Sequence, residues 1–490
     1  MSPQIDKEAS SQPEPRALDA YNAAPTLEEI IQLTQQELTA AQEDDSIVEC
    51  GRAALSLLHA NPNLAAKLAY QKLHDVPYKE VKECWRRLYT DAALWRVLST
   101  TEGRKKQAHL NEEWIDEVVV LLDWALILTA VPRRETVVEL WFAALEEELS
   151  TRASGHAAPD PLERPAKKPK FDNVVSIPSV FPATVVKSPM TLRHCLPRCD
   201  RPSLSAFQRK LSSPATHTPV IIENALQHWP ALAERPWSDP RYLLKRTLGG
   251  KRLVPIETGR SYTDSGWGQK ISTFKDFMTT YMLENDTLFQ DKSQTGYLAQ
   301  HDLFAQIPSL RADISIPDLC YCDPAPNSLP NIKETHKLED PLLNAWFGPK
   351  GTVSPLHTDP YHNILAQVVG HKYIRLYAPD QTESLYPRSI DENGVDMSNT
   401  SLVDLDEAIE LFPEIGLGQE GNPVPHSQAE IDRGDAQQKK LEFEARFPGF
   451  AAAKYIEGIL GPGECLYLPP GWWHYVKSLS PSFSVSFWFN

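Results

Sequence analysis

The chain has 490 residues, of which 41% are hydrophobic and 9% aromatic, a composition that excludes a wholly disordered polypeptide and suits two folded regions joined by linkers. Its formal net charge of −16 disfavours contact with a phosphate backbone, so we expect no direct nucleic-acid binding. A basic protein or peptide meets a more favourable electrostatic field.

The first 150 residues divide into a tail and a helical region. Residues 1–25 are polar and dotted with proline, without the apolar core of a signal peptide, and are expected to be disordered. From 26 to 150, apolar residues recur three and four positions apart, which predicts amphipathic helices. Thr26 and Glu29 have the spacing of a capping box. We expect a helical bundle or an array of helix pairs, whose tryptophan and leucine stripes favour packing faces; a protein-interaction surface is the alternative.

The most apolar run of the chain, residues 118–131, lies within this helical region. It is shorter than the roughly 20 apolar residues that span a bilayer, and it contains Asp123. We therefore expect a buried helix here and no membrane association.

Residues 151–190 are rich in Ala, Pro and Ser and lose all periodicity, so they are expected to form a linker. This linker contains a basic cluster, residues 164–170, in an otherwise acidic chain. Two interpretations stay open, a nuclear-import signal and a solvated run of charge. The first predicts a nuclear protein, and a cytoplasmic pool is compatible with both.

From 191 to 490 the pattern changes to short β-rich runs separated by turns. Many short strands without alternating helices predict a sandwich or jelly roll. The expected fold class is therefore α+β, with an all-α N-terminal region followed by a β domain. Gly370-His371, between two of the β-rich runs, predicts a hairpin turn. Residues 416–438, rich in Gly, Gln, Asn, Pro and Asp, are expected to be a surface insertion.

Two side chains, His357 and Asp359, suggest a metal site. In a strand, residues two positions apart face the same side, so this imidazole and this carboxylate can bind one ion. They supply two of the three ligands of the facial triad of non-heme iron enzymes, which leaves the other iron positions open. His474 follows a Pro-Pro-Gly turn and is the candidate third ligand. Either motif alone can occur by chance, and a histidine among aromatic residues is usually a hydrogen-bonded core residue.

Several motifs together resemble a known family. They are Asn344-Ala-Trp-Phe-Gly348, Ser354-Pro-Leu-His-Thr-Asp-Pro360, Gly370-His-Lys-Tyr-Ile-Arg-Leu-Tyr377 and Trp472-Trp-His474. These segments are similar to those of the JmjC-domain oxygenases, and the run 344–379 is especially similar to the arginyl hydroxylase branch, also described as histone lysine demethylases. The resemblance covers roughly 185–490 and implies a JmjC double-stranded β-helix, a cupin-like jelly roll. The stretch 416–438 is longer than in the family pattern, which puts surface contacts in doubt and leaves the iron core unaffected.

The resemblance also implies Fe(II) as the cofactor, with 2-oxoglutarate and O2 as cosubstrates. The implied iron ligands and catalytic residues are His357, Asp359 and His474. The far carboxylate of 2-oxoglutarate needs a buried cation and hydroxyl donors, because an unpaired buried anion is costly. By resemblance, Lys372 supplies the charge, Tyr297 and Ser354 supply the hydroxyls, and Asn363 holds the carboxylate nearest the iron. A solvated lysine beside a turn is the alternative for Lys372.

Five further residues could form an acidic, aromatic-walled slot for the substrate. They are Glu257, Tyr262, Trp267, Trp346 and Trp488. A carboxylate pairs with a guanidinium while flat rings stack on it, which suits an arginine side chain, and the resemblance implies such a pocket. Methyl-lysine also fits an aromatic cage, and a surface glutamate beside core tryptophans is the remaining alternative.

The leading hypothesis is a protein hydroxylase that acts on arginyl side chains of a protein or peptide substrate. Its rival is demethylation of methylated histone lysine, in which the hydroxylated methyl group leaves as formaldehyde. A third hypothesis, from another class, is a catalytically silent cupin-like binding module whose helical region recruits partners. The complete set of iron ligands together with Lys372 argues against this third hypothesis.

Overall fold

The computed structural model describes residues 24–40, 44–106, 112–155, 177–182, 191–264, 266–283, 295–326, 329, 332, 335–391, 394–416 and 429–490. The chain divides into two compact units, Met1–Lys170 and Phe171–Asn490, and each is described by itself. The expected tail 1–25 and linker 151–190 lie mostly outside the described residues, as does the whole basic cluster at 164–170.

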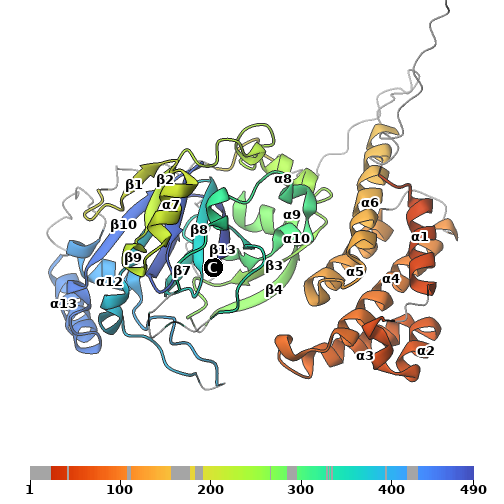
Figure 1. Cartoon of the computed structure of the whole chain (residues 1–490), viewed down its shortest axis with the longest axis horizontal. Helices are drawn as coiled ribbons and strands as arrows, with labels where there is room; N and C mark the ends of the chain where they lie inside the picture. The colour runs from red at the N-terminus through yellow and green to blue at the C-terminus, as the bar shows by residue number, and fades with distance from the viewer. Residues whose placement is uncertain are drawn as a thin grey trace, which may run out of the picture. The chain divides into compact units, whose positions relative to one another are not determined.

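The N-terminal unit is helical, as the apolar periodicity predicted (Figure 1). Its described α-helices are α1 (Leu27–Thr39), α2 (Arg52–Ala60), α3 (Pro62–His74), α4 (Glu83–Lys106), α5 (Glu113–Thr129) and α6 (Glu135–Gly155), with a 3-10 turn, η2 (Ser46–Cys50), before α2. The capping box at Thr26 is present, because its side chain accepts from the Glu29 N–H while the Glu29 carboxylate accepts from the Thr26 N–H. α3 begins at a proline behind Asn61, whose side chain accepts a hydrogen bond from Leu64 N–H.

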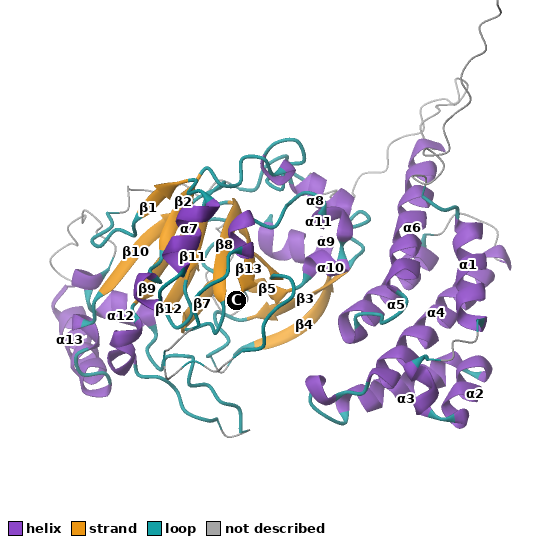
Figure 2. Cartoon of the chain, in the orientation of Figure 1, coloured by secondary structure: helices purple, strands orange, loops and turns teal. Residues whose placement is uncertain are grey.

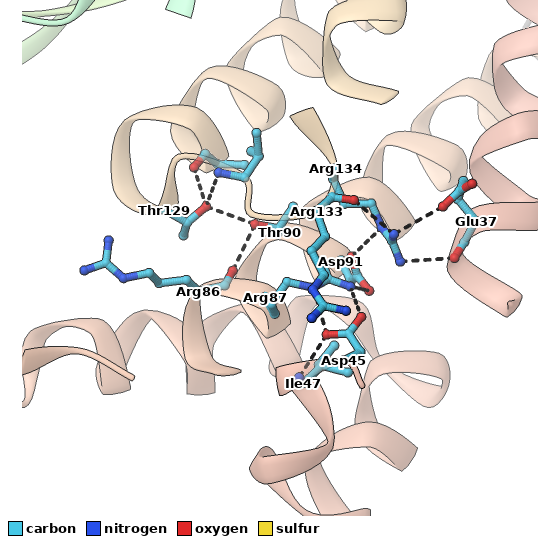
Figure 3. A network of polar contacts seen from close by, with 12 residues as sticks. Glu37, Asp45, Ile47, Arg86, Arg87, Thr90, Asp91, Thr129, Arg133 and Arg134 are labelled. Atoms are coloured by element: carbon cyan, nitrogen blue, oxygen red, sulfur yellow. Dashed lines mark hydrogen bonds and ion pairs between the residues drawn. The ribbon is translucent and has the colours of Figure 1, made fainter. Parts of the chain in front are cut away.

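A network of buried charges joins the segments of this unit (Figure 3). Arg87, on α4, has no exposed surface and donates to Asp45 (Nη2 to Oδ2, 2.7 Å) and to Asp91 (Nη1 to Oδ1, 2.7 Å). Arg134, beside the start of α6, donates to Asp91 at 3.2 Å and to Glu37 on α1 at 3.3 Å. Each buried guanidinium therefore has carboxylate partners, which offsets the cost of removing its charge from water.

The second unit contains two β-sheets. Its strands are β1 (Arg198–Asp200), β2 (Val220–Glu223), β3 (Leu253–Thr258), β4 (Gly268–Thr273), β5 (Gly296–His301), β6 (Leu342–Gly348), β7 (Val353–His357), β8 (His362–Val369), β9 (Lys372–Tyr377), β10 (Tyr455–Leu460), β11 (Cys465–Leu468), β12 (Trp473–Ser478) and β13 (Ser482–Phe489). The nine-stranded sheet has the order β1-β2-β11-β8-β13-β6-β5-β3-β4, and the four-stranded sheet has the order β10-β9-β12-β7. The two sheets, which are antiparallel apart from the parallel pair β1–β2, form the predicted jelly roll, so the chain is α+β overall.

Helices cover the outer sides of the sheets (Figure 2). They are α7 (Leu204–Leu211), α8 (Pro240–Arg246), α9 (Phe274–Phe277), α10 (Leu303–Gln306), α11 (Pro308–Arg311), α12 (Leu405–Leu411) and α13 (Ala429–Arg446). Helices α8 to α10 share a buried apolar cluster with the large sheet, whereas α12 and α13 share one with the small sheet. A third cluster, which includes Leu365, Ile374, Leu466 and Val476, draws on strands of both sheets and fills the interior between them.

The predicted hairpin at Gly370-His371 is wrong. β8 and β9, on either side of this turn, belong to different sheets, so the turn carries the chain from one layer of the jelly roll to the other. Gly370 has a φ of +70°, and a Cβ at this position would lie 2.0 Å from the carbonyl oxygen of Pro481. A glycine is therefore required by the close approach of the Pro481 segment and by the backbone conformation.

The expected insertion 416–438 falls mostly outside the described residues, and its described part from Ala429 onward belongs to α13. Later residues of α13, Phe443 and Phe447, are buried in the cluster shared with the small sheet. In the part of the chain that the structure describes, no helix combines the length and the hydropathy needed to cross a membrane.

Candidate active site

The three candidate iron ligands meet at the end of the small sheet. β7 and β12 are neighbours in this sheet, and His357 on β7 lies opposite His474 on β12. Their ring centroids are 4.0 Å apart. Asp359, two residues beyond the first histidine, places Oδ1 3.8 Å from His357 Nε2 and Oδ2 3.5 Å from His474 Nε2. The potential ligand atoms all lie within 4.8 Å of one another, so one ion can contact all three residues.

The hydrogen bonds of the two imidazoles leave the same nitrogen available on each ring. Nδ1 of His357 lies 2.7 Å from the carbonyl oxygen of Pro355, and Nδ1 of His474 lies 3.1 Å from that of Trp472. A carbonyl oxygen only accepts, so Nδ1 carries the proton and a neutral ring turns an unprotonated Nε2 toward Asp359.

Burial accounts for the charge state of this group. Burial, together with the neighbouring His357, lowers the pKa of His474 well below its ordinary value, so this ring is neutral. Burial also raises the pKa of Asp359, against the attraction of His357. Lone pairs of imidazole nitrogen and carboxylate oxygen that converge in a buried place fit a divalent cation, and this donor set is that of non-heme Fe(II).

One cavity of about 570 Å³ is lined by all twelve residues that the sequence suggested for the site. They are Glu257, Tyr262, Trp267, Tyr297, Trp346, Ser354, His357, Asp359, Asn363, Lys372, His474 and Trp488. The residues come from both sheets, from the β3–β4 loop and, for Asp359, from the connection between β7 and β8. The jelly roll thus brings together segments that lie far apart in sequence.

Lys372, at the start of β9, is a buried cation without an acidic partner among the described residues. Only 2% of its surface is exposed, and its Nζ donates to the Tyr297 hydroxyl at 3.3 Å. Burial lowers the pKa of Lys372 to about 7. Burial also raises the pKa of Tyr297, while a hydrogen bond with Ser354 acts in the opposite direction. A cation with one neutral neighbour fits the carboxylate of a ligand.

Asn363, on β8, presents a second unsatisfied polar group to the cavity. Its residue is 5% exposed, and its Oδ1 has no hydrogen-bond partner among the described residues. Buried polar atoms are almost always hydrogen-bonded in native proteins. An atom of this kind in a cavity is therefore available to a ligand.

The cavity wall also includes the carboxylate of Glu257, on β3, together with several aromatic side chains. Burial raises the pKa of Glu257, and a hydrogen bond with Trp267 lowers it only in part. Trp346 on β6 is held by a 3.0 Å hydrogen bond from its Nε1 to Ser486 Oγ. Trp488 on β13 stacks on Tyr361 with ring centroids 5.7 Å apart. Each of these indoles therefore has a contact that fixes its orientation in the cavity wall.

Sequence reasoning missed several cavity residues, among them Gln300 and the segment Met397–Thr400. Gln300 has a φ of +47° and lies at an irregularity in the pairing of β5 with β6, which no sequence signal marks. The segment 397–400 reaches the site because Thr358 N–H donates to the Asn399 carbonyl at 2.8 Å. No sequence signal marks this contact, so only the tertiary structure could place the segment at the site.

Comparison with known proteins agrees with the fold. Residues 205–490 match the family described as "Cupin-like domain". Over 422 residues, the chain is 36% identical to "Lysine-specific demethylase 8" of Danio rerio, with 86% of this chain and 85% of that protein covered. The protein of the same name in Xenopus tropicalis is 31% identical over 490 residues, with 94% and 96% covered.

A more distant relative is the human "Bifunctional peptidase and (3S)-lysyl hydroxylase JMJD7", which is 26% identical over 279 residues and covers 56% of this chain and 77% of its own length. The chain belongs to the JmjC-domain family of cupin-like, 2-oxoglutarate-dependent oxygenases. Proteins of this family generally use Fe(II) and 2-oxoglutarate and act on protein substrates.

Proposed function

We propose that this oxygenase hydroxylates arginyl side chains of a protein substrate. The observation that carries the proposal is the half-buried carboxylate of Glu257, which lines the same cavity as several aromatic rings and the three candidate metal ligands. Among the described residues, no lysine or arginine forms an ion pair with Glu257 within 4.0 Å. A guanidinium from a substrate would supply the missing positive charge.

Fe(II) would be held by His357, Asp359 and His474, whose donor atoms converge as described above. With 2-oxoglutarate and O2, bound iron supplies the oxidising chemistry that decarboxylates 2-oxoglutarate to succinate and hydroxylates a C–H bond. The chain itself orients the ligands, because the Pro355 and Trp472 carbonyls fix both imidazole rings.

The buried lysine and asparagine would bind 2-oxoglutarate. Lys372, with the hydroxyls of Tyr297 and Ser354, offers a cation and donors for the far carboxylate. Asn363 would donate from its side-chain Nδ2 to the carboxylate nearest the iron. Its Oδ1, which has no partner among the described residues, can only accept and would face a donor. The apolar side chains of Leu365, Leu466 and Val476, which also line the cavity, keep water from the interior of the jelly roll.

Geometry around Glu257 favours arginine over a methylated ammonium. A guanidinium is planar, donates hydrogen bonds in its plane, and stacks on indole faces such as those of Trp346 and Trp488. Positioning is the main task of the pocket, because reacting atoms must be held near 3–3.5 Å apart. With its own donors paired to Glu257, the arginine would present the C–H bonds of its aliphatic stem toward the metal ligands.

A second candidate is demethylation of histone methyl-lysine, which is favoured by the name lysine-specific demethylase of the Danio rerio and Xenopus tropicalis relatives. The aromatic walls accept a methylated ammonium through cation–π contacts. In that case Glu257 acts by charge alone, because a trimethylated ammonium has no N–H to donate. We also propose nuclear localisation, for which the basic cluster at 164–170 is the sequence motif.

A peptide assay distinguishes the two candidates. Purified protein is incubated with Fe(II), 2-oxoglutarate and peptides that contain arginine or trimethyl-lysine, and the products are analysed by mass spectrometry. We expect one oxygen atom to be retained on arginine. Loss of a methyl group as formaldehyde, with arginine unchanged, would overturn the proposal in favour of demethylation. His357→Ala should reduce succinate formation by more than about 100-fold. Substitution of residues that only hydrogen-bond to metal ligands already lowers metal affinity or activity about 10–100-fold.

Glu257→Gln sharpens the assay. It removes the charge and keeps the shape, so we expect the KM for an arginyl peptide to rise at least about 30-fold, which corresponds to the ~2 kcal/mol lower bound for losing one partner of a buried charge pair. Turnover of a trimethyl-lysine peptide, if present, should depend much less on this substitution. Equal loss for both peptides would contradict a pairing of Glu257 with guanidinium.

A further inference from the structure

The β3–β4 loop, residues 259–267, carries two aromatic residues of the cavity, Tyr262 and Trp267. At its base, Gly259 has a φ of +108°, and a Cβ there would lie 3.1 Å from the Gly266 carbonyl oxygen. The two ends of the loop therefore approach each other closely. The orientation of its rings depends on the contacts that hold the loop against the rest of the unit.

Arg260, the second residue of this loop, contacts three carboxylates. Its Nε donates to Asp264 Oδ2 at 2.9 Å and its Nη2 to Asp264 Oδ1 at 3.1 Å, a two-bond pair within the loop. Its Nη2 also donates to Asp404 Oδ2, and its Nη1 lies 3.8 Å from Asp406 Oδ2. The hydrogen bonds that Arg260 donates to Asp264 and Asp404 raise the pKa of its guanidinium. An isolated surface pair contributes little, but a guanidinium shared by three carboxylates forms a network.

The two aspartates outside the loop lead to the strand of a candidate metal ligand. Asp404 is the N-cap of α12 and accepts the Asp406 N–H at 2.9 Å. Asp406 Oδ1 accepts from the Tyr475 hydroxyl at 2.6 Å and from Lys477 Nζ at 2.8 Å. Both donors belong to β12, next to His474. Asp406 therefore contacts both Arg260 of the loop and two side chains of this strand.

A parallel connection leads to the other metal-binding strand. Tyr262 forms a hydrogen bond with Thr400, only a few residues before α12. The segment around Thr400 is bonded to the end of β7, because Ser401 N–H donates to the Leu356 carbonyl at 2.9 Å. The loop is thus fastened to both strands that present imidazoles to the cavity.

We propose that Arg260 is a positioning residue for the protein substrate. By joining the β3–β4 loop to the start of α12, it holds Tyr262 and Trp267 at a set distance from the strands of His357 and His474. The aromatic rings and the metal ligands then keep a constant relative position, so the substrate side chain enters a preformed slot. The role in substrate binding rests on the proposed function, whereas the fastening of the loop does not.

Hydrogen exchange tests, without a protein substrate, whether Arg260 fastens the β3–β4 loop. Full-length wild type, Arg260→Met and the control Arg241→Met are compared with Mn(II) and 2-oxoglutarate bound. Arg241 is also paired with an aspartate, Asp239, at 2.8 Å but is more exposed and has no link to the loop. We expect amides of 259–268 to exchange about tenfold faster in Arg260→Met alone, because the loop opens more often. Unchanged exchange in this loop would overturn the proposal.

Kinetics test the consequence for binding, with an arginyl peptide that the wild type hydroxylates. We expect Arg260→Met to raise the KM about tenfold and to lower kcat less than threefold, since a small misplacement of the binding groups weakens productive binding. Arg260→Lys keeps the charge but not the two-bond geometry and should restore part of the KM. If kcat falls by the same factor as KM rises, and the melting temperature is also lower, the role of Arg260 is merely structural and the proposal is refuted. If no arginyl peptide is hydroxylated, the proposed function fails, while hydrogen exchange still decides whether Arg260 fastens the loop.

Discussion

Arg87 in the helical unit and Lys372 in the jelly roll are both buried cations, with 0% and 2% of their surfaces exposed. Arg87 meets the carboxylates of Asp45 and Asp91, whereas Lys372 has a neutral tyrosine as its neighbour. Burial opposes the charge in both cases. The two carboxylates outweigh burial and raise the pKa of Arg87, while burial alone lowers the pKa of Lys372 to about 7.

The difference separates a structural charge from one reserved for a ligand. In the helical unit, the charges satisfy one another and hold α1, α4 and the start of α6 in a single arrangement (Figure 3). In the cavity, Lys372 has no acidic partner and the Asn363 Oδ1 has no hydrogen-bond partner among the described residues. A buried group that its own fold leaves unsatisfied costs stability, and binding of a complementary ligand recovers that cost.

The largest expected effect is on the stability of the helical unit, where the buried cation Arg87 has carboxylate partners. Arg87→Met leaves Asp45 buried without its cation and Asp91 with Arg134 as its remaining cationic partner, so we expect the helical unit to lose about 3–5 kcal/mol of stability. Urea unfolding of the full chain, followed by circular dichroism, measures the loss. Arg86→Met, which removes the neighbouring and more exposed guanidinium, should cost less than about 1 kcal/mol. Equal losses of stability for the two substitutions would show that the buried charge network does not stabilise the helical unit.

Next in size is Lys372→Met, for which stability and function should change in opposite directions. Removing an unpaired buried amine should stabilise the ligand-free protein by about 1–2 kcal/mol. Affinity for 2-oxoglutarate should fall at least about 30-fold, because a buried carboxylate loses its cation. Thermal unfolding and a binding titration measure the two effects, with the exposed Lys454→Met as control. A destabilised variant with normal 2-oxoglutarate affinity would show that Lys372 is structural.

The smallest expected effect is a pH dependence of 2-oxoglutarate binding in the wild type. Below pH 7, Lys372 is already protonated and the affinity should be constant. Above pH 7, the protein must take up a proton when the anion binds, so the Kd should rise about tenfold per pH unit until the pKa of the complex is reached. Calorimetry between pH 6.5 and 8.5, in buffers of different ionisation enthalpy, measures both the Kd and the proton uptake. A Kd that stays flat across this range would mean that Lys372 is charged without its ligand.

The sequence allowed prediction of those features that depend on residue type and local period. His357 and Asp359 could be paired because alternate residues share a face of a strand, and the helices at 26–150 followed from apolar spacing. The resemblance to a family placed Lys372 and Asn363, whose chemistry alone would not distinguish them from solvated side chains. All of these residues line one cavity.

Features that depend on long-range packing could not be predicted. The turn at Gly370 was expected to form a hairpin, because local sequence cannot show that the next strand joins the opposite sheet. Neither the contact of Asn399 with Thr358 nor the link from Arg260 to α12 has a sequence signal. Arg87 gave no indication of burial either, because its carboxylate partners include Asp45, 42 residues away in the chain.

Both imidazoles of the active site donate their orienting hydrogen bond to the backbone, to the carbonyl two residues earlier in the chain. In many metal sites this support comes from a neighbouring carboxylate side chain. A main-chain carbonyl persists whatever side chain is attached to it. The aim of Nε2 toward the metal position is therefore insensitive to single substitutions around it, and the surrounding pocket is free to change its substrate without disturbing the ligands.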